Sequence, residues 1–122
     1  MTTMPEFQIL CALANVDIGD FANKPTALVA GQQEASRPIW QSPDGTLEIG
    51  LWECTPGRFA ADRSKSSEFC FFPSGRIVMT EQDGTRRTLS AGDSLMLPQG
   101  WKGQWDIAEH TRKIYVIQTV KA

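Results

Sequence analysis

Turn-forming residues recur along most of this chain and divide its apolar residues into short runs. From residue 46 onward the turn signals are Pro56-Gly57, Pro73-Ser74-Gly75, Asp83-Gly84, Ala91-Gly92-Asp93 and Pro98-Gln99-Gly100. They recur about every 8 to 17 residues, near the spacing typical of all-β sandwiches and barrels. No stretch shows a helical period with caps. The pattern therefore predicts an all-β fold.

Seven of the runs are predicted strands. Residues 47–53 show the clearest pattern, because apolar and other residues alternate there with the period of a half-buried strand. Residues 81–85 read as a hairpin turn, in which Gly84 supplies a positive φ. The other predicted strands are residues 68–72, 76–81, 86–89, 94–97, 104–108 and 112–120. Together they predict a jelly roll or a small β-barrel.

The chain of 122 residues and 13.5 kDa is the size of one domain. Residues 1–45 are weakly patterned and rich in proline, and residues 31–37 look like a loop. We expect residues 1–45 to form an extended N-terminal arm that packs on the barrel or on a partner subunit. Residues 46–122 then form the barrel core.

Charge and cysteine content narrow the class of protein. The chain has 12 basic and 14 acidic residues, a net charge of -2, so neither composition nor charge favours a nucleic-acid partner. The apolar-rich residues 7–16 are too few to cross a membrane, and the first basic residue is Lys24, unlike a secretory signal. Three cysteines without a CxxC pair are typical of free thiols. We expect a cytoplasmic protein.

Two spaced motifs carry a family resemblance. Glu68 is followed by six residues and Gly75, and Gly92 by five residues, Pro98, one residue and Gly100. The further matches are Trp52-Glu53, Trp105 and Lys113-x-Tyr115. Over residues 47–117 the chain resembles small single-domain cupins related to the cupin domain of ureidoglycine aminohydrolase. The resemblance implies a double-stranded β-helix, the cupin jelly-roll barrel, which is usually dimeric.

The run after Glu68 predicts a covered outer face. In a strand, Glu68, Cys70 and Phe72 share one face, and Phe69 and Phe71 share the other. Because both faces carry aromatic side chains, we expect a second subunit or the arm to cover the outer one. A homodimer is the prediction.

Cupins usually bind a divalent metal through two histidines and a glutamate of the first motif and one histidine of the second. Here Glu68 keeps its place, but the first histidine positions fall among residues 62–65 and Gly103 occupies the second-motif position. The single histidine, His110, lies outside both motifs. We therefore expect no metal cofactor, with a divalent ion held by Glu68, Asp62 and waters as the alternative.

A buried carboxylate requires a cation or a raised pKa, and this identifies the candidate catalytic residues. They are Glu68 as base, with Tyr115 or Lys113 as acid. Lys113 and Tyr115 share a strand face, which the resemblance places inward. The alternative is that Ile114 and Val116 face the core and that Lys113 and Tyr115 are solvated. For Glu68 itself, the alternative to a functional role is a structural ion pair.

Four residues are candidates for binding substrate. Trp105 lies two residues after Gly103 and can fill the space of the missing ligand, or simply be core. Cys70 shares a face with Glu68, and without a histidine it reads as an inert thiol. Arg58 and Arg63 flank a predicted entrance loop. There they either bind the carboxylate of a ligand or are solvated surface residues.

We conclude that the chain is a cupin-like barrel with an internal site for a small polar metabolite. Whether the site catalyses a reaction is open at this stage. One alternative is a metal-dependent hydrolase that acts on a ureidoglycine-type substrate. Another is a non-catalytic ligand-binding or sensory module.

Overall fold

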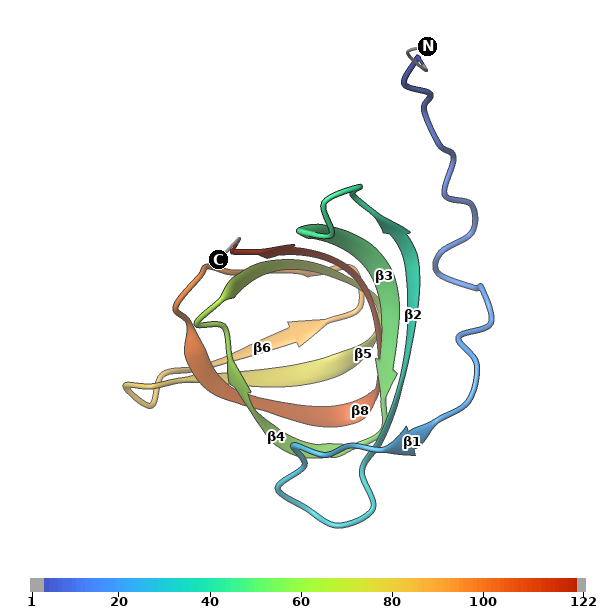
Figure 1. Ribbon diagram of the computed structural model, residues 1–122. Helices are drawn as coiled ribbons and strands as arrows, with labels where there is room; N and C mark the ends of the chain where they lie inside the picture. The colour runs from blue at the N-terminus through green and yellow to red at the C-terminus, as the bar shows by residue number, and fades with distance from the viewer. Residues whose placement is uncertain (1–3, 121–122) are drawn as a thin grey trace.

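The structure, a computed structural model, describes residues 4–120 and is built of strands (Figure 1). They are β1 (Ala22–Asn23), β2 (Gln33–Gln41), β3 (Leu47–Cys54), β4 (Gly57–Asp62), β5 (Ser66–Glu81), β6 (Arg86–Ser90), β7 (Ser94–Leu97) and β8 (Lys102–Thr119). The predicted all-β fold is confirmed. Within the described residues, no helix is long and apolar enough to span a membrane.

Strand β8 is the centre of the sheet. One edge of β8 pairs with β4 along its first half and with β3 along its second, while β5 pairs with the other edge. Strands β6 and β7 both pair with β5, and all of these pairs are antiparallel. Because β5 and β8 are long and strongly bent, they wrap the sheet around a single interior (Figure 1).

The bends replace two predicted turns. Residues 73–75 lie inside β5, where the register with β8 shifts three times between Phe71 and Ile77. Gly75 has φ +116°, and a Cβ there would overlap the side chain of Thr111. Residues 109–111, where the gap between the predicted strands 104–108 and 112–120 implied a turn, likewise lie inside β8. Irregular pairing at these bends lets one strand change direction where two shorter strands were predicted.

The segment predicted as an arm contributes a strand to the sheet. The loop predicted at residues 31–37 is wrong, because β2 begins at Gln33 and pairs with β3 from Glu34 onward. The sequence signal is weak because β2 is mostly polar and contains Pro38, which lies beside an irregularity in the pairing. Strand β4 was also absent from the predicted strands, whereas the hairpin turn at Gly84, with φ +91°, is confirmed.

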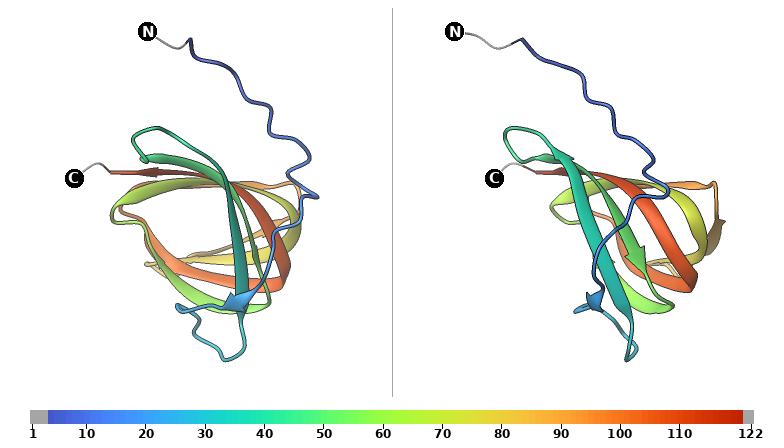
Figure 2. Two further views of the ribbon diagram at one scale, coloured as in Figure 1. Left: turned by 45° about the vertical axis from the view of Figure 1, so that its right-hand side comes forward. Right: turned by 90° about the vertical axis from the view of Figure 1, so that its right-hand side faces the viewer.

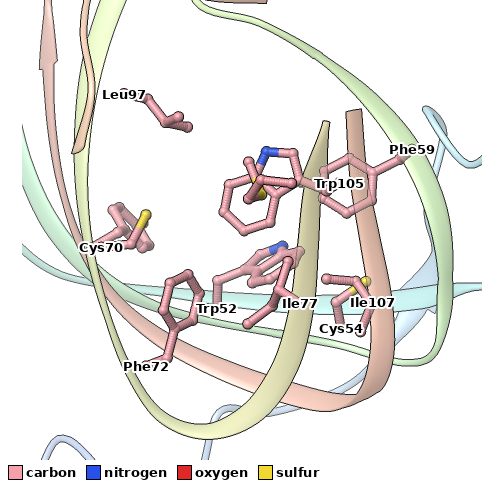
Figure 3. Close-up of a cluster of buried hydrophobic side chains, with 11 residues drawn as sticks. Trp52, Cys54, Phe59, Cys70, Phe72, Ile77, Leu97, Trp105 and Ile107 are labelled. Atoms are coloured by element: carbon pink, nitrogen blue, oxygen red, sulfur yellow. The ribbon is translucent and has the colours of Figure 1, made fainter. Parts of the chain in front are cut away.

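Buried apolar side chains form two clusters on opposite sides of the sheet. Figure 3 shows the larger cluster inside the barrel. Its members are Trp52, Cys54, Phe59, Cys70, Phe72, Ile77, Met79, Leu97, Trp105, Ile107 and Tyr115. The smaller cluster joins Ile18 of the arm to Ala35 and Leu51 on the outer face. The arm therefore covers part of the outer surface of the barrel.

Arg112 fastens the arm to the barrel. Its guanidinium donates to the carbonyl oxygens of Leu13, at 3.0 Å, and Val16, and it pairs with Glu53 at 2.9 Å. The Glu53 carboxylate also contacts the ring of His110 at 2.6 Å. Figure 2 shows the chain running along the outside of the barrel, with its first described residues leading away from it.

Replacing Arg112 with Ala should loosen the arm. The variant loses charge-assisted hydrogen bonds to two carbonyl oxygens and leaves Glu53 without that cation, so the free energy of unfolding should fall by roughly 2 kcal/mol. Amide hydrogen exchange at residues 13–18 should accelerate more than in the barrel strands. Arg86→Ala, at an exposed position of β6, is the control. Equal exchange at residues 13–18 in both variants would contradict the role of Arg112.

Candidate functional site

A pocket of about 220 Å³ opens into the barrel interior. Its lining combines charged side chains with aromatic rings from five strands and the arm. The lining residues are Lys24, Glu34, Ser36, Trp52, Phe59, Ala61, Arg63, Glu68, Trp105, Lys113, Tyr115 and Ile117. Five of the seven candidate site residues from the sequence therefore meet in one pocket.

Glu68 is the charged centre of the pocket and is completely buried. One carboxylate oxygen lies 2.7 Å from a guanidinium nitrogen of Arg63, and the other lies 2.8 Å from Nζ of Lys113. Burial alone would raise the pKa of Glu68, but the charges of Lys113 and Arg63 outweigh it and lower that pKa below its usual value. Glu68 is therefore an ionised carboxylate held between two cations.

Lys113 and Tyr115 face the interior, and Ile114 packs with the outer cluster. The outward alternative for Lys113 and Tyr115 is thus excluded. Their exposed fractions are 5% and 4%, and the Lys113 ammonium lies 4.4 Å from the ring centroid of Trp52. Contacts with aromatic faces and with a carboxylate together stabilise this buried ammonium.

Tyr115 is held by a neighbour on β3. It pairs with Gly50, where a Cβ would lie 2.6 Å from the tyrosine ring carbon that carries the hydroxyl. The absent side chain leaves room for the hydroxyl to donate to Glu48 at 2.6 Å. Burial and this hydrogen bond raise the pKa of Tyr115 above its usual value. Tyr115 is therefore a weak acid with its proton already shared.

Trp105 forms much of the pocket wall. Its ring is almost fully buried and lies nearly parallel to that of Phe59, with centroids 5.6 Å apart. The N–H of Trp105 is buried and has no hydrogen-bond acceptor in the protein. Trp105 was predicted to fill the space beside Gly103. The structure places Trp101 there instead, because a Cβ at Gly103 would overlap the ring of Trp101.

Two charged lining residues were missed in the sequence, and both come from the segment predicted as an arm. Lys24 follows β1 and lies 4.0 Å above the ring of Phe59, and its ammonium contacts Glu34 of β2 at 2.7 Å. Glu34 also accepts the N–H of Trp52 at 2.9 Å. Burial alone would raise the pKa of Glu34, but Lys24 and Trp52 outweigh it and lower that pKa below its usual value. Nothing in the local sequence pattern distinguishes this lysine and glutamate from surface residues.

Two candidate substrate-binding residues lie outside the pocket lining. Arg58 is exposed on β4, and no contact brings it to Glu68. Cys70 is fully buried beside Glu68, and burial raises the pKa of its thiol to about 12. The thiol is therefore protonated at neutral pH and unsuited to nucleophilic attack.

The residues present do not fit the divalent metal that the resemblance implies. Among residues 4–120, no three His, Cys, Asp or Glu side chains lie close enough to hold an ion together. Both oxygens of Glu68 already face cations, and Asp62 is exposed, with its carboxylate bonded to Ser64. The prediction of no metal cofactor stays a prediction that metal analysis can test.

Comparison with known proteins identifies the family to which the chain is similar. A family model described as the EutQ-like cupin domain matches residues 36–115. None of the curated proteins compared with the chain matches it. The structure resembles Clostridium difficile EutQ, at 19% identity and a TM-score of 0.64 over 75% of this chain and 66% of that one.

Two further solved structures share the fold. A Pseudomonas syringae protein of the DUF861 family is 24% identical, with a TM-score of 0.72 over 87% of this chain but only 45% of its own length. A cupin superfamily protein from Desulfitobacterium hafniense is 16% identical, with a TM-score of 0.63 over 96% and 94% of the two chains. At these identities the similarity shows the fold alone.

The charge on Glu68 should make the barrel sensitive to acid. Because its pKa in the folded protein is lowered from 4.5, ionised Glu68 stabilises the fold fully above about pH 4.5 and loses that effect as pH falls through the folded pKa. Glu68→Gln leaves the buried Lys113 and the partly buried Arg63 without their carboxylate partner and should cost roughly 3 kcal/mol at pH 7. The difference from wild type should shrink below pH 4.5.

Urea unfolding at a series of pH values measures this difference. Glu81→Gln, an exposed carboxylate at the β5–β6 turn, is the matched control and should leave stability almost unchanged. A gap between wild type and Glu68→Gln that stays constant down to acidic pH would contradict the ion-pair arrangement.

Proposed function

The chain belongs to the EutQ-like cupin domain family, and from this premise we propose that it binds a small polar metabolite inside the barrel without transforming it. One observation carries the proposal. Glu68, the candidate base, is paired through both oxygens with Arg63 and Lys113. The pocket thus has room for a ligand, but its carboxylate is already neutralised by the protein.

The pKa directions support binding rather than proton transfer. A general base and acid work best with pKa values near the working pH. The pKa of Glu68 is lowered and that of Tyr115 is raised, so each group moves away from neutrality. Cys70 stays protonated as well. A site tuned this way holds a ligand through fixed charges and hydrogen bonds.

A ureidoglycine-type hydrolase remains the alternative from the sequence. Such a reaction, as the resemblance implies it, depends on manganese. The pairing of Glu68 with Arg63 and Lys113 does not favour a metal there. A cytoplasmic location is also part of the proposal, supported by the free thiols of Cys11, Cys54 and Cys70.

Binding without turnover can be tested directly. A library of small polar metabolites should yield at least one that raises the melting temperature of the wild-type protein. Prolonged incubation followed by proton NMR should return that compound unchanged, with and without added manganese. Conversion that is lost in Glu68→Gln, but kept in Glu81→Gln, would overturn the proposal and identify an enzyme.

We also propose that the chain pairs with a second copy through the outer face of its sheet. The strand register aligns five apolar residues across this face: Trp40, Ile49, Val116, Phe69 and Met96. Phe69 is 43% exposed and Met96 56% exposed within one chain. An apolar row that crosses five strands supports an apolar occupant.

The arm of the second copy is the proposed occupant of this row. Phe7 and Ile9 are 89% and 75% exposed and alternate with Glu6 and Gln8, as in a strand that needs an apolar face. Figure 2 shows this segment extending away from its own barrel. The same chain therefore carries exposed apolar residues both on its arm and, at Phe69 and Met96, on its outer face.

Light scattering after size-exclusion chromatography tests this pairing. Wild type should elute as a dimer at micromolar concentration, and the double variant Phe7→Ser, Ile9→Ser should shift towards monomer, as should Phe69→Ser. Leu28→Ser, at an exposed apolar residue outside the row, should stay dimeric. A monomeric wild type would refute the pairing, and a dimeric Phe7→Ser, Ile9→Ser variant would refute the arm as its occupant.

A further inference from the structure

Two buried N–H groups of the pocket lining have no hydrogen-bond acceptor among residues 4–120. They are the indole N–H of Trp105, whose side chain is 1% exposed, and the Nε–H of Arg63. Figure 3 shows the indole of Trp105 within the barrel interior. In contrast, the N–H of Trp52 already donates to Glu34 at 2.9 Å. Because an unpaired buried donor costs free energy, these two groups favour a ligand that carries acceptors.

The charges of the lining point the same way. Lys24, Arg63 and Lys113 are three cations against two carboxylates, Glu34 and Glu68. Each carboxylate is already paired with at least one of these cations. The lining therefore has a surplus positive charge, which favours an anionic ligand in a pocket partly shielded from water.

Glu48 does not offset this surplus inside the pocket. It lies outside the lining, and its two oxygens accept hydrogen bonds from Tyr115 and from Gln41, each at 2.6 Å. Gln41 is exposed, so this carboxylate is near solvent and screened by it. The pocket thus presents unpaired N–H donors to a ligand, while both carboxylates of its lining are already ion-paired with cations of the protein.

The walls and the size of the pocket require an organic part in the ligand. The rings of Trp52, Phe59 and Trp105 form the apolar side, and the last two lie within 18° of parallel. The volume of about 220 Å³ equals that of about seven water molecules, more than an inorganic anion fills. A short carbon skeleton against these rings uses the remaining space.

From these observations we infer that the ligand of the barrel is a small organic carboxylate. Its carboxylate accepts hydrogen bonds from Trp105 Nε1 and Arg63 Nε near the surplus positive charge, and its carbon skeleton packs against the aromatic walls. This inference rests on the binding function proposed above, since it names the chemical class of the molecule held in the same pocket.

Paired probes that differ only in charge test the inference. Titration calorimetry with acetate and acetamide, succinate and succinamide, and benzoate and benzamide measures the ratio of affinities within each pair. The best carboxylate should bind at least about tenfold more tightly than its amide, as expected for a charge-assisted hydrogen bond. Inorganic phosphate, which has no carbon skeleton, should bind more weakly than that carboxylate.

Conservative variants locate the carboxylate in the pocket. Trp105→Phe removes the unpaired N–H and keeps a ring, and Arg63→Lys removes Nε–H but keeps a cation beside Glu68. Each should lower the carboxylate-to-amide affinity ratio by about tenfold. Arg58→Lys, outside the pocket, is the matched control that should keep the ratio.

The outcomes separate the inference from the binding function. Amides or phosphate that bind as tightly as the carboxylates would overturn the inference and leave binding in the barrel standing. A ratio unchanged in both Trp105→Phe and Arg63→Lys, or no binding by either series at millimolar concentration, would overturn it too. Selective carboxylate binding followed by chemical conversion would support the inference and overturn binding without turnover.

Discussion

The ion pairs of Glu68 with Arg63 and Lys113 constrain how the strands of the barrel are arranged. Its carboxylate comes from β5, and its partners come from β8 and from the segment after β4. An unpaired charge among these aromatic rings would be strongly unfavourable, so the three elements must meet in one arrangement. The pairing of Cys70 with Tyr115 across β5 and β8 places Glu68 and Lys113 within reach of each other. A slip of one residue in that register would place Glu68 and Lys113 on opposite faces of the sheet.

The same charges decide what the pocket can do chemically. The neighbouring cations keep Glu68 ionised. Burial and the hydrogen bond from Tyr115 to Glu48 keep that tyrosine protonated. The interior therefore holds fixed charges and oriented N–H groups between aromatic walls. Such a lining supports the proposed ligand binding, because acid–base catalysis depends on groups that change their protonation.

The N-terminal segment is part of the site as well as a cover for the barrel. Lys24 and Glu34 line the pocket, and Ile18 packs on the outer face over Leu51. Arg112 joins the two regions because it binds the carbonyl oxygens of the arm from within β8. Arm and barrel thus form one structure, and a change that frees the arm also affects the strands that carry the pocket.

Local patterns in the sequence determined the all-β fold, the hairpin at Gly84 and the common face of Lys113 and Tyr115, because period-two alternation and turn residues act over a few neighbours. Glu68, Arg63 and Trp105 could be expected near one another from the family resemblance. Only the tertiary structure decided the continuous bent strands and the entry of Lys24 and Glu34 into the pocket. The shifts in register between β5 and β8, and the pairing of the polar strand β2 with β3, both depend on residues that are distant in the chain. A local sequence pattern carries no information about such partners.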